Sequence, residues 1–294
     1  MSLCLLCKDE NDYLDEWINY HRNIGVEHFY IYDHKSQIPI AQTCEKYIQQ
    51  GILDVILWTQ TDARTQVGAY EDCCLKYKED NRWIGFIDTD EFLVIKNPYN
   101  NVKELMQQYE NVGGLGINWL MFGCSYLKTQ PKSVLKNFFM SSKNSYEENK
   151  HIKTIVNPKL VAKIESPHHA SLLAMKPVKW YRNSSKINRI TETIIRFLSF
   201  GLRKTYKDSG AIVNENFEQI NHASFSLPSH NKCQVNHYYT RSEGEFLRKV
   251  ERGRGDQEEG RKKEEFYEKQ HLFNTVNQTE NMHHWLRFAE KDTE

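Results

Sequence analysis

Long apolar runs are missing from this sequence of 294 residues. The longest mostly apolar stretch, 112–124, is shorter than the roughly 18 residues that a membrane helix needs, and Asn118 and several glycines interrupt it. The N-terminus has only a short apolar segment before the charged residues Lys8, Asp9 and Glu10, and we therefore expect no signal peptide. These absences predict a protein that is made and kept in the cytoplasm.

An excess of one charge and a metal-binding cysteine pattern are also missing. The chain has 39 Lys and Arg against 39 Asp and Glu, which argues against binding nucleic acid through bulk positive charge. Of its seven cysteines, Cys4 and Cys7 form a C-x-x-C pair, but no second pair follows with zinc-ligand spacing. The cysteines are therefore predicted to be buried, reduced thiols.

The zero net charge hides an uneven distribution along the chain. Residues 1–100 carry 17 acidic and 9 basic residues, and the remainder has the opposite imbalance. The stretch 172–207 alone has nine Lys and Arg and one acidic residue. An acidic first half can bind a metal ion, and a basic second half can face phosphates, an anionic glycan or a lipid surface.

Strand and helix patterns alternate in the first 90 residues. Buried strands are expected at 3–7, 28–32, 52–58 and 83–87, with amphipathic helices between them. This rhythm predicts an α/β fold with a mostly parallel sheet flanked by helices. Ligands bind at the carboxyl ends of such strands. We therefore expect one cleft surrounded by the acids that follow these strands, namely Glu10, Asp33, Asp62, Asp88 and Asp90.

The second half of the chain has a weaker pattern. It contains charged helices at 242–252 and 260–271 and an amphipathic, basic helix at 186–202. Such a basic helix can pack in the protein, or it can lie on an anionic membrane surface. The absence of a clean linker predicts one compact domain with an elaborated C-terminal half.

The most informative motif is the acidic turn Asp88-Thr89-Asp90, which follows the apolar stretch 83–87. Two carboxylates at this spacing can reach one divalent cation, and Mg²⁺ or Mn²⁺ prefers such oxygen ligands and also binds phosphate. The alternative is an acidic loop that caps the next element.

Four segments, 8–21, 25–33, 83–92 and 235–253, resemble the family 2-like and family 92-like glycosyltransferases of the GT-A fold, which include many bacterial enzymes of surface-polysaccharide assembly. The resemblance implies a nucleotide-sugar-binding half at 1–125 and an acceptor-side half at 126–294. It implies transfer from a nucleotide-diphosphate donor, such as a UDP-sugar, to a hydroxyl of a glycan or lipid-linked acceptor. The implied cofactor is Mn²⁺ or Mg²⁺, and the implied pathway is surface polysaccharide or lipopolysaccharide synthesis.

The resemblance also assigns roles to residues around the acidic turn. Asp88 and Asp90 match the metal-binding Asp-x-Asp, and His237 matches a third metal ligand, with a strand histidine satisfied by backbone as the alternative. Asp33 and Glu10 match positions that contact the nucleoside, and for Glu10 a helix-start acid favoured by the dipole is the alternative.

Further basic and aromatic positions match the family more loosely. Arg64 is implied to bind phosphate, with a surface charge as the alternative. Lys249 and Arg252 begin a basic loop that can close over the diphosphate, or they form a solvated helix end. Lys153 matches a basic position of the middle region. Trp119 is a candidate for stacking on the acceptor sugar, although a large aromatic in a strand is more often core.

The general base that an inverting transfer needs is not obvious. No Asp or Glu lies between Glu110 and Glu147, where many family 2-like enzymes carry one. The candidates are Glu91, Glu165 and His168 with its neighbour His169, and the resemblance favours inversion.

Two other functions remain open from the sequence. A nucleotidyl or sugar-phosphate transferase could use the same acidic pair, but it would want a glycine-rich phosphate loop, and 8–14 contains no glycine. A glycan-binding module without turnover is the second alternative.

Overall fold

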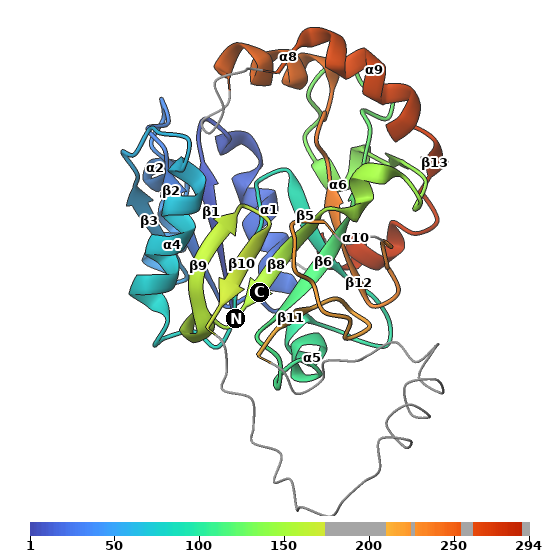
Figure 1. Cartoon of the computed structure of the whole chain (residues 1–294). Helices are drawn as coiled ribbons and strands as arrows, with labels where there is room; N and C mark the ends of the chain where they lie inside the picture. Colours follow the sequence, from blue (N-terminus) through green and yellow to red (C-terminus); the bar gives the residue numbers. More distant parts are fainter. Residues whose placement is uncertain (174–209, 225–226, 254–260, 290–294) are drawn as a thin grey trace, which may run out of the picture.

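The computed structural model describes residues 1–173, 210–224, 227–253 and 261–289 (Figure 1). The strands are β1 (Ser2–Cys7), β2 (His28–Asp33), β3 (Leu53–Leu57), β4 (Ile84–Phe86), β5 (Glu91–Ile95), β6 (Gly114–Met121), β7 (Met140–Ser141), β8 (Ile152–Val156), β9 (Val161–Ser166), β10 (His169–Leu172), β11 (Ile212–Val213), β12 (Cys233–His237) and β13 (Val276–Asn277). The α-helices are α1 (Asn11–Asn23), α2 (Ile40–Thr43), α3 (Glu45–Gln49), α4 (Thr65–Tyr77), α5 (Val102–Gln107), α6 (Val134–Asn137), α8 (Glu243–Arg252), α9 (Lys263–Phe273) and α10 (His283–Ala289).

One large mixed sheet dominates the described residues. Its strand order is β3-β2-β1-β4-β8-β6-β12-β5, and β11 pairs with β6. The first four strands run parallel, as predicted. β8 runs antiparallel to β4 and β6, and β12 runs antiparallel to β5. The sheet is therefore mostly parallel on the β3 side and mixed on the β5 side, where strands distant in sequence meet.

Apolar side chains cover both faces of this sheet, as expected for strands that are buried on both sides. Along β1, Leu3 and Leu5 belong to one apolar cluster and Cys4 to the other. α1 packs against α10, and α4 packs against β9 and β1. Successive side chains of β1 thus point into different apolar clusters, one on each face of the sheet.

Most predicted elements are confirmed, with two exceptions. The helix expected at 42–50 is two short helices, α2 and α3, which meet at Cys44. The basic helix predicted at 186–202 lies outside the described residues. All seven cysteines are free and buried, as predicted. No helix within the described ranges is long and apolar enough to cross a bilayer.

The C-terminal helices α8 and α9 run across the top of the molecule in Figure 1. α8 begins with a capping box, in which the Ser242 hydroxyl oxygen accepts the Glu245 N–H and the Glu245 carboxylate accepts the Ser242 N–H. This start fixes the helix so that its last turn carries Lys249 and Arg252. Both side chains line cavities beside the carboxyl end of β1.

Candidate active site

The acidic turn joins β4 to β5 and is held in place by α1. The indole nitrogen of Trp17 donates to the carbonyl oxygens of Asp88 and Glu91, at 3.1 and 2.9 Å. Trp17 itself is fully buried. Because both ends of the turn bond to one rigid side chain, the two aspartates are presented from a fixed backbone.

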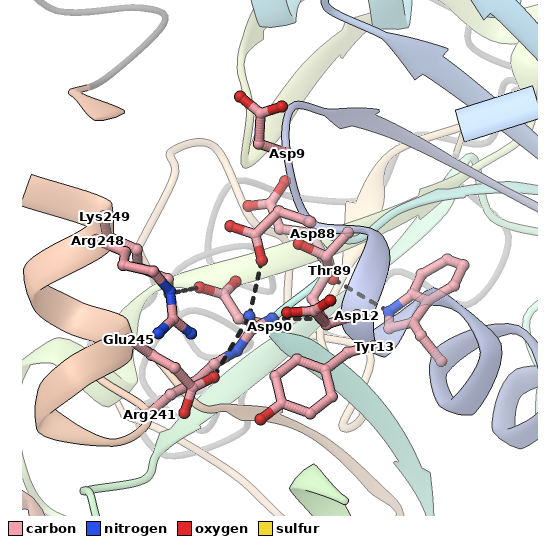
Figure 2. A network of polar contacts seen from close by, with 12 residues as sticks. Asp9, Asp12, Tyr13, Asp88, Thr89, Asp90, Arg241, Glu245, Arg248 and Lys249 are labelled. Carbon is pink, nitrogen blue, oxygen red and sulfur yellow. Dashed lines mark hydrogen bonds and ion pairs between the residues drawn. The ribbon is translucent and has the colours of Figure 1, made fainter. Parts of the chain in front are cut away.

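Asp90 is the more enclosed of the two aspartates, and it contacts groups from distant parts of the chain. Its Oδ2 accepts a hydrogen bond from Lys249 Nζ at 2.6 Å, and its Oδ1 lies 3.6 Å from His237 Nε2. Figure 2 shows Lys249 reaching from α8 toward Asp90. Burial alone would raise the pKa of Asp90, but the charges of Lys249, His237 and Arg241 outweigh it and hold that pKa well below its usual range. Asp90 is therefore a carboxylate throughout the physiological pH range.

Asp88 is more exposed and has three side-chain donors. Its Oδ2 accepts from Lys153 Nζ at 2.7 Å, and its Oδ1 accepts from Gln66 Nε2 at 2.7 Å and from the Tyr70 hydroxyl at 3.2 Å. Lys153 is buried, and the charges of Asp88 and Glu91 overcome the effect of burial and raise its pKa. Lys153 thus holds Asp88 through a buried ammonium and does not line either cavity near the turn.

Glu91 follows the turn and has no exposed surface. Its Oε2 accepts the Asp88 N–H at 2.9 Å and lies 3.3 Å from Lys153 Nζ. Burial raises the pKa of Glu91 to about 8, against the opposing charge of Lys153. Glu91 does not line either cavity.

His237 comes from β12 and lies opposite Glu91 in the antiparallel pairing of β12 with β5. Its ring packs against Trp119, with the ring centroids 4.3 Å apart. Burial lowers the pKa of His237 to about 3, although Asp90 acts in the opposite direction. The imidazole is therefore neutral at pH 7 and has a lone pair for a cation.

Glu10, at the end of β1, is tied to two arginines. Its carboxylate oxygens lie 2.7 Å from Arg241 and 2.6 Å from Arg252. Arg241 also donates to the Thr89 carbonyl at 3.1 Å, and its guanidinium lies over the ring of Tyr13 (Figure 2). Arg241 thereby links the end of β1 to the middle of the acidic turn.

A cavity of about 350 Å³ lies at this edge of the sheet, a size typical of small-molecule sites. It is lined by the strand ends, the acidic turn and α8, through Leu6, Lys8, Glu10, His34, Gln66, Asp88, Thr89, Asp90, Trp119, Pro167, His168, His237, Tyr239, Lys249, Arg252, Gly253 and Arg261. A second cavity, of about 620 Å³, lies between α8 and the start of α1 and shares Lys8, Glu10, Lys249 and Arg252 with the first. The structure therefore gathers Glu10, Asp88, Asp90, Trp119, His168, His237, Lys249 and Arg252 around one cavity.

Besides Lys153 and Glu91, four acidic or basic residues singled out from the sequence do not line this cavity. Asp33 accepts the backbone N–H groups of Ser36 and Ile40, at 2.9 and 3.0 Å. The side chains of Arg64, Glu165 and Asp62 lie at the surface and bond locally. Arg64 bonds Glu71, Glu165 bonds Lys163 and Ser171, and Asp62 bonds Gln60 and the Arg64 N–H. Position after a strand was a correct signal for Glu10, Asp88 and Asp90, but it did not place every acid on the cavity.

The aromatic and histidine side of the cavity comes from the middle of the chain. Trp119 is 9% exposed, and its ring contacts His168 and His237 at centroid distances of 5.0 and 4.3 Å. His168 Nδ1 lies 3.0 Å from the Ile152 carbonyl, so Nδ1 carries the proton and Nε2 is the acceptor. Burial, with help from the charge of Lys153, lowers the pKa of His168 to about 3. Both residues line the cavity.

Sequence reasoning gave no role to Arg241, Lys8, His34 or Tyr239, which line the cavities. Arg241 and Tyr239 lie within 235–253, one of the segments that carry the family resemblance. The resemblance therefore identified the segment, but it did not predict that these two side chains line a cavity. Arg241 contacts a carboxylate 231 positions earlier, and no local pattern reveals such a pairing.

The donor chemistry around Asp90 fits a divalent cation. Asp90 Oδ1 and His237 Nε2 face each other at 3.6 Å, and carboxylate and neutral imidazole are both ligands that Mn²⁺ accepts. In the described part of the chain, no three His, Cys, Asp or Glu side chains converge as a metal cluster. A cation on this pair would therefore take its other ligands from Asp88 after a side-chain shift, from phosphate oxygens or from water.

The ion pairs of Glu10 give a prediction for acid stability. Arg241, Lys249 and Arg252 lower the pKa of Glu10 from its ordinary value near 4.5, although burial by itself would raise it. A group with a lowered folded-state pKa stabilises the protein above its unfolded pKa, and this contribution is lost as the pH falls. We expect Glu10→Gln to reduce the free energy of unfolding by about 3 kcal/mol at pH 7 and by much less at pH 3.

Urea unfolding at the two pH values measures this difference. Glu79→Gln is the matched control, because Glu79 pairs with Lys159 at the exposed surface and should show no measurable change. If Glu10→Gln lowers the free energy of unfolding by the same amount at both pH values, the prediction is contradicted.

The fold and the site define a class: a mixed α/β protein with an acidic turn at the carboxyl ends of its parallel strands. The family model described as "Glycosyltransferase family 92" matches residues 2–241, and the chain belongs to this family. The resemblance inferred from the sequence motifs is thereby confirmed.

Relatives in plants are similar over part of the chain. A glycosyltransferase family 92 protein of Ricinus communis is 32% identical over 135 residues, which are 45% of this chain and 24% of the relative. One of Oryza sativa subsp. japonica is 27% identical over 174 residues, which are 57% of this chain and 29% of the relative. The matches thus span less than a third of the length of these relatives.

Solved structures match part of the chain at low identity. S. aureus TarS in complex with UDP has a TM-score of 0.35 and 15% identity, over 54% of this chain and 47% of that one. The mannosyltransferase PcManGT of Pyrobaculum calidifontis in complex with GDP-Man and Mn²⁺ has a TM-score of 0.33 and 9% identity, over 54% and 44% of the two chains.

Proposed function

We propose that this protein transfers a glycosyl group from a nucleoside-diphosphate sugar, with a UDP-sugar as the predicted donor, to a hydroxyl of a glycan or lipid-linked glycan. One observation carries the proposal: Asp88, Asp90 and His237 lie on the same cavity as the cationic side chains Lys249 and Arg252. A departing diphosphate is stabilised by a divalent cation, which carboxylates can hold, and by cationic side chains that bind its phosphate oxygens. Both kinds of group are present on this cavity. Membership of glycosyltransferase family 92 supports the transfer of a sugar.

The leaving diphosphate would lie between Asp90 and α8. Mn²⁺ or Mg²⁺ on Asp90 and His237, with Asp88 nearby, would supply neutralisation of the phosphate charge. Lys249 Nζ already lies 2.6 Å from Asp90, so a small side-chain rotation would direct its ammonium to a phosphate oxygen. Arg252, in the same last turn of α8, contacts the carbonyls of Lys8 and Asp9 and can hold the loop that follows β1 against the donor.

The nucleoside would lie over the ends of β1 and β2, where Leu6, Lys8 and His34 line the cavity. For Asp33 we propose an indirect role, because its carboxylate holds two backbone N–H groups of the loop after β2. For Arg64, which is bound to Glu71, contact with the nucleotide would require that ion pair to open.

The acceptor would bind on the Trp119 and His168 side of the cavity, where an indole face can stack on a sugar ring. Among Glu91, Glu165 and His168, His168 is the one that lines the cavity. Its low pKa makes Nε2 a weak base, so we propose that it orients the acceptor hydroxyl as a hydrogen-bond acceptor. Inversion of the anomeric centre stays a prediction, which the ¹H NMR coupling of the first-formed product would test.

The pathway and the cellular location also stay predictions. Surface polysaccharide or lipopolysaccharide synthesis would place the acceptor near the inner membrane, and the basic stretch 172–207 is the predicted contact. Residues 174–209 lie outside the described ranges, so the structure gives no support to this contact. Flotation with anionic liposomes tests it, and no binding would remove the idea.

Calorimetry and thermal shift with UDP and Mn²⁺ test the proposed function. We expect UDP to stabilise the protein only when Mn²⁺ or Mg²⁺ is present, and we expect one member of a panel of nucleotide-sugars to release UDP or another nucleoside diphosphate. Release of pyrophosphate would indicate a nucleotidyltransferase. Indifference to every nucleotide would overturn the proposal and favour a glycan-binding module.

A further inference from the structure

Two buried polar atoms beside the acidic turn face each other without a hydrogen-bond partner. They are Glu91 Oε1 and His237 Nδ1, and they lie 3.9 Å apart. This distance is about 1 Å longer than a hydrogen bond between imidazole and carboxylate. An unpartnered polar atom in a buried position costs free energy, so two of them side by side indicate an interaction that forms in another state of the site.

The other oxygen of Glu91 is already engaged with the acidic turn. Oε2 accepts the Asp88 N–H at 2.9 Å and lies 3.3 Å from Lys153 Nζ, which in turn bonds Asp88 Oδ2 at 2.7 Å. The pairing of β5 with β12 places His237 directly opposite Glu91. A single carboxylate therefore faces three groups: the turn backbone, the lysine that holds Asp88, and the histidine that faces Asp90.

We propose that Glu91 is a positioning residue that sets the orientation and tautomer of His237. Its Oε1 accepts the proton on Nδ1 once the gap closes, and Nε2 then directs its lone pair toward Asp90 Oδ1 and a cation held there. Carboxylates commonly orient metal-binding histidines through the second ring nitrogen. The inference rests on the proposed function, because Glu91 would orient His237 toward the cation that the proposed function places on Asp90 and His237.

This role replaces the sequence-based interpretation of Glu91 as a general base. A base must reach the acceptor hydroxyl, and Glu91 has no exposed surface and does not line the cavities. Its side chain instead accepts the Asp88 N–H, lies beside Lys153 and faces His237.

Glu91→Gln tests the proposal, because the glutamine amide has the size of the carboxylate and its hydrogen-bond partners allow only one orientation. The two groups at Oε2, the Asp88 N–H and Lys153 Nζ, are both donors, so they select the amide oxygen there. The amide NH₂ then faces His237 Nδ1 and makes it an acceptor, which moves the ring proton to Nε2.

Nitrogen-15 NMR of the histidine rings reads the tautomer in the metal-free protein. The measurement is made at pH 9, where a histidine with its ordinary pKa of about 6.5 is neutral and its ring carries a single proton. We expect His237 to carry its proton on Nδ1 in the wild type and on Nε2 in Glu91→Gln. Protonation of Nε2 in the wild type, or an unchanged tautomer in the variant, would overturn the proposal.

Titration with Mn²⁺ alone provides the second measurement. We expect Glu91→Gln to weaken Mn²⁺ binding by about 10- to 100-fold. If Glu91 acts through His237, the double variant with His237→Gln binds Mn²⁺ no more weakly than His237→Gln alone. Additive losses would show that Glu91 acts independently of His237 and would contradict the proposal.

Glu215→Gln is the matched control for a buried glutamate. Glu215 is 3% exposed, and its carboxylate accepts the N–H groups of Lys232 and Cys233 at the opposite end of β12. We expect this variant to leave the His237 tautomer and the Mn²⁺ affinity unchanged. If the wild type binds no Mn²⁺, the metal part of the proposed function fails, and the tautomer measurement still decides the role of Glu91.

Discussion

Asp90→Asn is expected to reduce kcat/KM for sugar transfer by about a thousandfold, equivalent to about 4 kcal/mol of transition-state stabilisation. The substitution removes the charge that faces both Lys249 and His237, at 2.6 and 3.6 Å, while keeping the side-chain shape. It should also abolish the Mn²⁺-dependent part of UDP binding. Steady-state kinetics with the donor found in the nucleotide-sugar panel, together with calorimetry, would measure both effects.

Asp62→Asn is the control for this substitution. Asp62 also follows a strand and is also an aspartate, but its exposed side chain bonds Gln60 Nε2 and the Arg64 N–H and does not line either cavity. Its replacement should leave kcat/KM within about twofold, since a surface change away from the site has little effect. Equal losses in the two variants would mean that the acidic turn is not the centre of the reaction.

Lys249→Met should change turnover and metal affinity in opposite directions. The ammonium is buried and bonds Asp90 Oδ2 and the Tyr239 carbonyl, at 2.6 and 2.8 Å. Without it, a cation on Asp90 loses a neighbouring like charge, and we expect Mn²⁺ to bind about tenfold more tightly. The leaving diphosphate loses a fixed positive charge, and kcat/KM should fall by about a hundredfold.

Arg248→Met provides the comparison on the same helix. Arg248 is adjacent in sequence and loses the same charge, but its side chain bonds Gln130 and lines only the neighbouring cavity. The Mn²⁺ affinity and kcat/KM of this variant should both stay near the wild-type values. A Lys249→Met variant that loses Mn²⁺ affinity together with turnover would show that Lys249 supports the cation instead of competing with it.

Local patterns in the sequence were sufficient for the first half of the fold. The alternation of apolar strands and amphipathic helices predicted β1 to β4 and α1 and α4, because each element repeats its own period over a short stretch. The same reasoning placed Glu10, Asp88 and Asp90 together, since the carboxyl ends of parallel strands meet at one edge. It failed for the helix at 42–50, where Cys44 has φ of −104° and ψ of 17° and separates two short helices.

The sequence by itself determined the α/β class, the acidic turn and the family, because these follow from local periodicity and from motifs that are continuous along the chain. The tertiary structure alone decided which charges are paired: Lys249 with Asp90, Arg241 with Glu10, and Lys153 with Asp88. These partners are separated by 159, 231 and 65 positions. The pairing of β12 with β5, the pairing of β8 with β4 and the position of α8 beside the end of β1 bring these partners within bonding distance. The free energy of such a pair depends on burial, which a local window of sequence does not contain.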